Sequence, residues 1–264
     1  MPNDLTIFRK IYDWFNDSIN CVFPSAPVVG SERLFMEEEF NLPELLKEMD
    51  IGITSYTKKK LSSDFIKEVL PQDILERIDE YVTKFSGDKY EVDGFMKNKN
   101  HLVKVKITQD SLTAEEIIFH HNNEEIGFVL GEESDGTKRL IELFSIFCNL
   151  NGSKIYIVDE LDRSLHPLLV RKFVEKYLEL VQDKDIKTQL IITTHESNIL
   201  DLDLVRRDEI WFVEKDDRHV SSLYSLDEFK VHHSKKIDRA YLIGRYGAIP
   251  EFKSLGIDGD SCNA

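Results

Sequence analysis

Apolar residues recur with two different periods along the chain, and the period changes near residue 100. Before that point they recur every three or four positions, which is the period of an amphipathic helix. This period predicts helices over 4–20, 42–49, 64–69 and 72–85, with a loop over 21–30 and a short strand over 52–56. From residue 101 the period falls to two, which predicts strands over 101–107 and 117–121.

A largely apolar run over 154–158 leads directly into Asp159 and Glu160. Such a short run predicts a buried parallel strand, and ligands of open α/β sheets bind at the carboxyl ends of the strands. Two adjacent carboxylates can divide the chemistry there: Asp159 holds Mg²⁺, usually through water, and Glu160 orients or deprotonates an attacking water. The alternative is a surface strand end with two solvated acids.

The segment upstream of this run predicts an amphipathic helix over about 135–149, with Ser134 and Gly136 at its N-terminus. Free backbone N–H groups and the positive end of the helix dipole make that place attractive to phosphate. Gly136 also lets a phosphate approach the backbone closely. The alternative is an ordinary cap, in which Ser134 or Asp135 accepts a hydrogen bond from the first turn.

A second buried strand is predicted over 188–195, and His195 closes it. A helix over 167–181 separates this strand from the acidic one, which makes a βαβ unit. Because both strands are parallel, Glu160 and His195 are expected at the same edge of the sheet. There His195 can contact a γ-phosphate or polarise the attacking water, although a histidine at a strand end is also often structural. Farther along, the pattern predicts a hairpin over 209–214 and 221–226.

At this point the chain resembles the ATP-binding-cassette class of ATPases. It is most similar to the AAA-type bacterial ATP-binding proteins related to SMC and DNA-repair ATPases, several of which serve in phage defence and abortive infection. The matching segments are a signature loop at 132–138, Walker B at 155–160, a D-loop at 164–167, a switch histidine at 195 and a closing segment at 244–250. Asp135 and Leu161 stand where many transporter cassettes have Gly and Pro, which favours the SMC-like branch.

The resemblance implies roles for individual residues. Ser134, Gly136, Asp159, Ser164 and His166 would bind nucleotide, with Asp159 as the magnesium ligand. Glu160 and His195 would be catalytic, and the cofactors would be ATP and Mg²⁺. In this family Ser134 and Gly136 would act in trans, on a γ-phosphate held by a partner subunit.

The resemblance also implies an α/β fold: an ABC-ATPase-like lobe with a mixed, partly parallel sheet flanked by helices, preceded by a mainly helical arm. Residues 1–100 would form this arm or insert region. Residues 101–255 would form the lobe with the signature loop, Walker B and the switch histidine. Residues 256–264 would be a flexible tail.

The phosphate-cradling loop G-x-x-x-x-G-K-[ST] is missing from the sequence. Gly87-Asp-Lys89 lacks the preceding glycine and the hydroxyl residue, and Gly30-Ser31 lacks the lysine. In the resembled family that loop lies in an N-terminal lobe. We therefore interpret the chain as the C-terminal part of such a protein, from a split gene, a late translation start or a truncated copy. Its nucleotide affinity alone is expected to be low, because the loop and its lysine bind the β- and γ-phosphates.

Two functions remain open at this stage. The first is an ATP-hydrolysing module that works in a homodimer or with a separate P-loop lobe and regulates an effector protein, in phage defence for example. The second is a non-catalytic remnant that serves as an interaction or dimerisation module. A nuclease of the ATPase-plus-Toprim kind would need a further acidic domain after about residue 250, and Asp258 and Asp260 are too few for it.

Composition narrows the class of partner. The net charge of −15 argues against a broad nucleic-acid-binding surface. No apolar run approaches the ~18 residues of a membrane span, and acids and aromatics from Asp4 onward argue against a signal peptide. Three cysteines, far apart, favour a reducing cytoplasm. His120 and His121 point to opposite faces of a strand, which argues against their sharing a metal ion.

Overall fold

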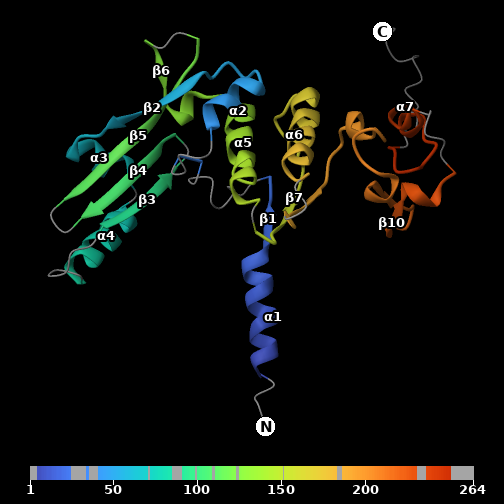
Figure 1. Cartoon of the computed structure of the whole chain (residues 1–264), viewed down its shortest axis with the longest axis horizontal. Helices are drawn as coiled ribbons and strands as arrows, with labels where there is room; N and C mark the ends of the chain where they lie inside the picture. Colours follow the sequence, from blue (N-terminus) through green and yellow to red (C-terminus); the bar gives the residue numbers. More distant parts are fainter. Residues whose placement is uncertain are drawn as a thin grey trace, which may run out of the picture. The chain divides into compact units, whose positions relative to one another are not determined.

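The structure is a computed structural model that describes residues 5–24, 34–35, 41–70, 72–84, 91–98, 100–108, 111–122, 125–150, 152–182, 186–230 and 236–250. The chain forms two compact units, residues 1–194 and 195–264. Figure 1 shows the elements of both units in chain order. Gly30-Ser31, Gly87–Lys89 and the tail over 256–264 lie outside the described residues.

The first unit contains a parallel sheet of three strands in the order β1-β7-β8. These are β1 (Ile19–Val22), β7 (Ile155–Val158) and β8 (Gln189–Ile192). The helix α6 (Pro167–Leu180) connects β7 to β8, which confirms the predicted βαβ unit. Pro167 begins this helix, where its missing N–H costs no hydrogen bond.

The helix α5 (Asp135–Phe144) precedes β7 and contributes Leu140, Leu143 and Phe144 to the core of the first unit. Aromatic rings join α5 to α6: Phe147 lies 5.8 Å from Phe144 and 4.9 Å from Phe173, measured between ring centroids. The predicted helix over 135–149 is therefore shorter as an α-helix and ends in the 3₁₀ turn η3 (Phe147–Asn149).

The strand β1 corrects the prediction of a helix through residue 20 and a loop from residue 21. The helix α1 (Leu5–Ser18) ends at Ser18, and β1 follows without a break. Its four residues are too few to display a period of two, so the pattern cannot distinguish them from the end of a helix. The strand forms because β7 accepts it in parallel, with Val22 opposite Val158.

The first unit also contains an antiparallel sheet in the order β2-β5-β4-β3, with β6 paired to β5. Its strands are β2 (Ser55–Lys60), β3 (Glu91–Lys97), β4 (Leu102–Thr108), β5 (Leu112–His120) and β6 (Gly127–Phe128). Three helices accompany it: α2 (Leu42–Glu48), α3 (Ser63–Val69) and α4 (Gln72–Lys84). Buried residues of α3 and α4 pack with Val103 and Val105 of β4.

The predictions for this region were largely confirmed. The fold is α/β, with a parallel sheet, antiparallel sheets and flanking helices. The described residues before residue 100 include the helices α1 to α4 and also the strands β1, β2 and β3. The sequence analysis did not predict the strand β3. Its segment contains three charged residues and Gly94, and none of its residues is fully buried, so the apolar pattern of a core strand is weak. Ion pairs of Asp93 with Lys104 (3.1 Å) and of Glu91 with Lys106 (2.5 Å) bind it to β4. The proposed domain boundary near residue 100 stays a prediction.

The second unit contains the predicted hairpin, formed by β9 (Trp211–Lys215) and β10 (Ser221–Ser225). It also contains α7 (Ile237–Leu242). Phe212 lies in its core, stacked 5.5 Å from Tyr241 and 5.8 Å from Tyr246. Further 3₁₀ turns among the described residues are η2 (Leu130–Glu132), η4 (Ser197–Ile199), η5 (Arg207–Glu209) and η6 (Leu226–Glu228).

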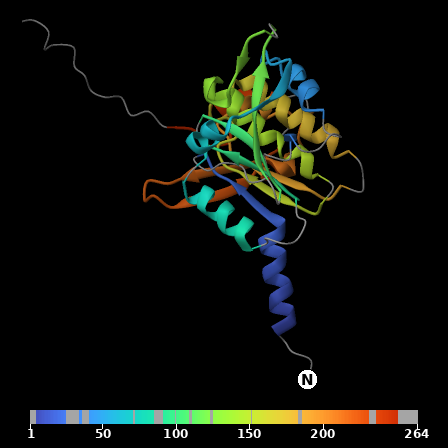
Figure 2. The same ribbon diagram turned by 90° about the vertical axis from the view of Figure 1, so that its left-hand side faces the viewer.

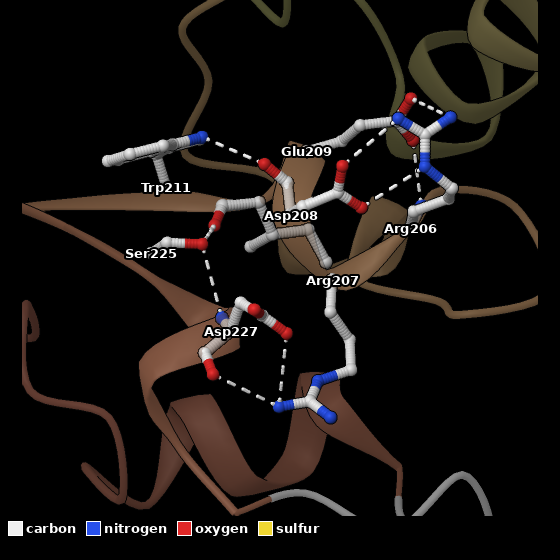
Figure 3. Close-up of polar contacts among 8 residues, drawn as sticks. Arg206, Arg207, Asp208, Glu209, Trp211, Ser225 and Asp227 are labelled. Atoms are coloured by element: carbon white, nitrogen blue, oxygen red, sulfur yellow. Dashed lines mark hydrogen bonds and ion pairs between the residues drawn. The ribbon is translucent and has the colours of Figure 1, made fainter.

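A polar network stabilises the start of this hairpin (Figure 3). Arg206 Nε donates to Asp208 Oδ1 at 3.1 Å, and Trp211 Nε1 donates to the Asp208 carbonyl at 3.0 Å. Arg207 Nη2 forms an ion pair with Asp227 Oδ1 at 3.4 Å and thereby links the turns η5 and η6. These contacts hold the two turns beside the hairpin, so the network reads as structural.

Candidate functional site

Asp159 and Glu160 follow the carboxyl end of β7, the central strand of the parallel sheet. The Asp159 N–H donates to the Val22 carbonyl at 2.9 Å and extends the pairing with β1 by one residue. Asp159 is half-buried and Glu160 is exposed. Both carboxylates therefore lie where open α/β sheets bind ligands, as the sequence predicts.

Thr193, one residue beyond β8, holds both of these acidic residues. Its hydroxyl donates to Asp159 Oδ1 at 2.6 Å and accepts the Glu160 backbone N–H at 2.9 Å. The Thr193 carbonyl also accepts the N–H of Leu161 at 2.9 Å. One residue thus fixes an oxygen of the first carboxylate and the backbone of the second.

Glu160 has a backbone φ of +47°, in the left-handed region that non-glycine residues rarely adopt. Such a conformation costs about 1–3 kcal/mol and persists only where the surroundings impose it. The hydrogen bonds of Thr193 to the backbone of Glu160 and Leu161 are among the contacts that impose it. The chain therefore turns sharply at the residue with the candidate catalytic carboxylate.

Arg139 of α5 approaches the same peptide group from the other side. Its side chain is buried, with 6% exposure, and Nη2 donates to the Asp159 carbonyl at 3.4 Å. Its Nε has no hydrogen-bond partner among the described residues. Burial lowers the pKa of the Arg139 guanidinium, an effect that the nearby Glu142 carboxylate opposes. The helix α5 is thus in direct polar contact with the end of β7.

Ser134 caps α5 in the way that the alternative interpretation anticipates. Its hydroxyl accepts the Thr137 N–H at 3.1 Å and lies 2.9 Å from the Thr137 hydroxyl. Ser134 is nevertheless exposed, so capping and contact with a phosphate are compatible uses of this position. The buried carboxylate of the preceding residue, Glu133, lies 3.0 Å from His121 Nε2, within hydrogen-bond distance, and anchors the loop to the residue that follows β5.

Gly136 is required by a close approach to the predicted D-loop. A Cβ atom at this position would lie 2.6 Å from the Ser164 carbonyl oxygen, well inside van der Waals contact. Ser164 itself has a φ of +62°. The structure therefore brings Gly136 and Ser164 of one chain together, which the sequence order alone did not predict.

The two candidate histidines have different settings. His166 is the N-cap of α6, and its Nδ1 accepts the Leu168 N–H at 3.2 Å. His195 is exposed, comes three residues after β8 and begins the second unit. The strand that it was expected to close therefore ends earlier, at Ile192. The assignments of all seven candidate residues to nucleotide or catalysis remain proposals.

Sequence reasoning missed two residues of this site. The only signal for Thr193 is that it is a hydroxyl residue directly after a short apolar strand. Arg139 is adjacent to Leu140 and Ile141 in a helix that is buried nearly all round, so periodicity gives no reason to select it. Both residues become recognisable only through their contacts with Asp159.

The donor set at this site fits a magnesium–nucleotide complex better than a protein-only metal centre. Among the described residues there is no group of three or more His, Cys, Asp or Glu side chains that could hold a metal ion. Mg²⁺ is commonly held by one or two carboxylates together with substrate phosphates and water. Asp159 suits that role, because Thr193 engages only one of its two oxygens.

Comparison with known proteins identifies a family. The model described as "AAA domain, putative AbiEii toxin, Type IV TA system" matches residues 6–201, which is 196 of the 264 residues. The match includes Ser134, Gly136, the acidic strand end at Asp159 and Glu160, and His195. A search of curated proteins and a search of solved structures found no match. In the part of the chain that the structure describes, no helix is long and apolar enough to cross a membrane.

Proposed function

Because the chain belongs to this family of AAA domains, we propose that it is an ATPase module that hydrolyses ATP together with a P-loop lobe in the same complex. The observation that carries the proposal is the fixed peptide between Asp159 and Glu160, which Thr193 and Arg139 hold from two sides. An ordinary solvated strand end would not need a left-handed glutamate and a buried arginine at the same peptide group.

The roles follow from the chemistry of each group. Glu160 is exposed and its backbone is fixed, so its carboxylate is suited to orient and deprotonate a water molecule. Asp159 would hold Mg²⁺, which would neutralise negative charge on the phosphates. His195 would polarise the same water or contact the γ-phosphate. Ser134, Gly136, Ser164 and His166 would contact nucleotide across a subunit boundary, as in ABC-type sites.

The need for a separate P-loop is part of the proposal. Ser134 offers a hydroxyl and a helix N-terminus, but neither is a substitute for the lysine and the row of N–H groups of a phosphate loop. A P-loop lobe in the same complex would complete the site, and ATP would then hold the two lobes together. Hydrolysis would release them and so regulate an effector, for example in phage defence.

Calorimetry with Mg-ATP on the purified chain tests the half-site proposal. We expect no binding in the micromolar range, because the β- and γ-phosphates lack their main ligands. Micromolar binding by the chain alone would show that the site is complete without a P-loop, and the proposed dependence would be wrong.

Turnover in the assembled complex tests the catalytic role. Glu160→Gln should lower phosphate release by about 10²–10⁴-fold, the usual contribution of a general base, and should leave ATP bound. Gln has the size of Glu, and Glu160 is exposed, so the melting temperature should not change. Unchanged turnover in this variant would favour the competing proposal, an interaction module without catalysis.

A further inference from the structure

The helix α1 carries a broad apolar surface that is exposed to solvent. Figure 1 and Figure 2 show it extending from the start of β1. Its large apolar side chains are Ile7, Phe8, Ile11, Tyr12, Trp14 and Phe15, and each is 47–69% exposed. Four of them, at positions 7, 11, 14 and 15, follow the spacing of a single helical stripe, and positions 8 and 12 widen it.

The area of this surface lies at the upper end of what an isolated monomer usually leaves exposed. An aromatic side chain covers about 150–250 Å² when it is fully buried, so the exposed parts of the four rings amount to roughly 400–500 Å². The largest apolar patch of a typical monomer is about 300–600 Å² in total, and Ile7 and Ile11 add to the rings of α1. Stable protein interfaces bury about 800 Å² per partner, so the apolar surface of α1 would supply the larger part of such an interface.

The charges of α1 also distinguish it from the rest of the chain. The chain has a net charge of −15, whereas α1 has two basic and two acidic residues and no net charge. Two copies of the chain repel each other over most of their surfaces. This helix is a place where they can approach with less repulsion.

The positions of Lys10 and Asp17 select one orientation for such a contact. Lys10 lines an open groove along α1 together with Ile7, Ile11, Trp14 and Phe15, so it lies at the edge of the apolar stripe. Asp17 comes seven residues later, which is two helical turns or about 10 Å along the same flank. In an antiparallel pair related by a two-fold axis, Lys10 of each copy faces Asp17 of the other. A parallel pair would place Lys10 beside Lys10.

We infer that α1 is a dimerisation helix that pairs in antiparallel orientation with α1 of a second copy of this chain. The apolar stripe forms the centre of the interface, and the two Lys10–Asp17 pairs flank it and set the register. The helix would then gain the tertiary packing that a 14-residue helix needs, because helices of this length are marginal in water on their own. This inference does not depend on ATP hydrolysis.

Sedimentation of the full chain over a range of concentrations is the first measurement. We expect a monomer–dimer equilibrium that Ile11→Asp and Phe15→Asp each abolish. Thr6→Asp is the matched control, because it adds the same charge to the same helix outside the apolar stripe, and it should leave the dimer intact. Far-UV circular dichroism would verify that the variants are folded, which their exposed positions favour.

Charge exchange then tests the orientation. Lys10→Glu and Asp17→Lys should each weaken the dimer by about two- to tenfold, because each removes both flanking pairs and brings like charges together. The double variant restores opposite charges in an antiparallel pair and should recover the dimer. A double variant weaker than either single one would exclude this register.

Two results would overturn the inference. A chain that stays monomeric at every concentration leaves no role for a second copy, and association only on addition of a P-loop-bearing protein would assign α1 to that partner instead. A dimer that survives both Asp substitutions must use another surface. In each case the ATPase proposal is unaffected, since calorimetry and the Glu160→Gln variant test it separately.

Discussion

Replacement of Thr193 by Val tests whether the site is organised as described. Val has nearly the shape of Thr but lacks the hydroxyl, so the substitution removes the 2.6 Å bond to Asp159 Oδ1 and the 2.9 Å bond from the Glu160 N–H. A hydrogen bond to a charged group contributes about 1.5–3 kcal/mol and a neutral one about 0.5–1.5 kcal/mol. Thr193 is exposed and water can replace part of both contacts, so we expect a total loss of roughly 1–2 kcal/mol.

The consequence should be local, and amide hydrogen exchange can detect it at one residue. A loss of 1–2 kcal/mol at the Glu160 amide would raise its exchange rate by about 5–30-fold, since 1.4 kcal/mol corresponds to a factor of ten. The melting temperature should fall by only a few degrees. Thr193→Ser is the matched control, because it keeps the hydroxyl and should retain slow exchange at Glu160.

The exchange rates give a clear refutation. If the Val variant protects the Glu160 amide as well as the unaltered chain does, the hydroxyl does not hold that peptide. If the Ser variant, which keeps the hydroxyl, exchanges as fast as the Val variant, the hydroxyl alone does not account for the protection of the Glu160 amide. Either result would remove the Thr193 hydroxyl from its assigned role.

Further predictions address the contacts around this peptide and the core beneath it. Gly136→Ala should destabilise the first unit by about 1–3 kcal/mol in urea unfolding, because its Cβ would lie 2.6 Å from the Ser164 carbonyl oxygen. Gly94→Ala is the control and should not destabilise it, because a Cβ there would have no atom within 4 Å. Equal effects of the two substitutions would contradict the close approach at Gly136. Arg139→Met should change the free energy of unfolding little, since a buried, incompletely paired arginine can be replaced by an apolar residue of similar length, but it should lower turnover in the assembled complex. Unchanged turnover would make Arg139 a packing residue only. Burial raises the pKa of Tyr177 to about 12 from 10.0, so the folded state holds this proton more tightly than the unfolded state. The contribution of Tyr177 to the free energy of unfolding is fully present below pH 10. It decreases by up to about 2–3 kcal/mol as the pH rises toward 12. In the Tyr177→Phe variant, the free energy of urea unfolding should decrease less steeply over that pH range than in the unaltered chain. An equally steep decrease in the variant would show that other groups cause it.

The sequence was sufficient for the parts of the fold that local patterns encode. The apolar run before Asp159, the helix that begins at Pro167 and the next apolar run predict a βαβ unit, because handed crossovers leave few other arrangements. The structure has that unit, with β7 and β8 parallel. The same pattern placed Asp159 and Glu160 at the carboxyl end of a strand, and the hairpin near residue 216 was equally predictable from its two alternating segments.

Only the tertiary structure decided which residues meet. The strand β1 exists because β7 pairs with it, and four residues contain too little periodicity to reveal it. Thr193 and Arg139 contact the peptide after Asp159 from positions 34 and 20 residues away, and Gly136 meets the Ser164 carbonyl. These contacts depend on the packing of α5 and β8 around β7. A one-dimensional pattern records the burial of each segment but not its neighbours, so the sequence predicted the carboxylates and the structure identified what holds them.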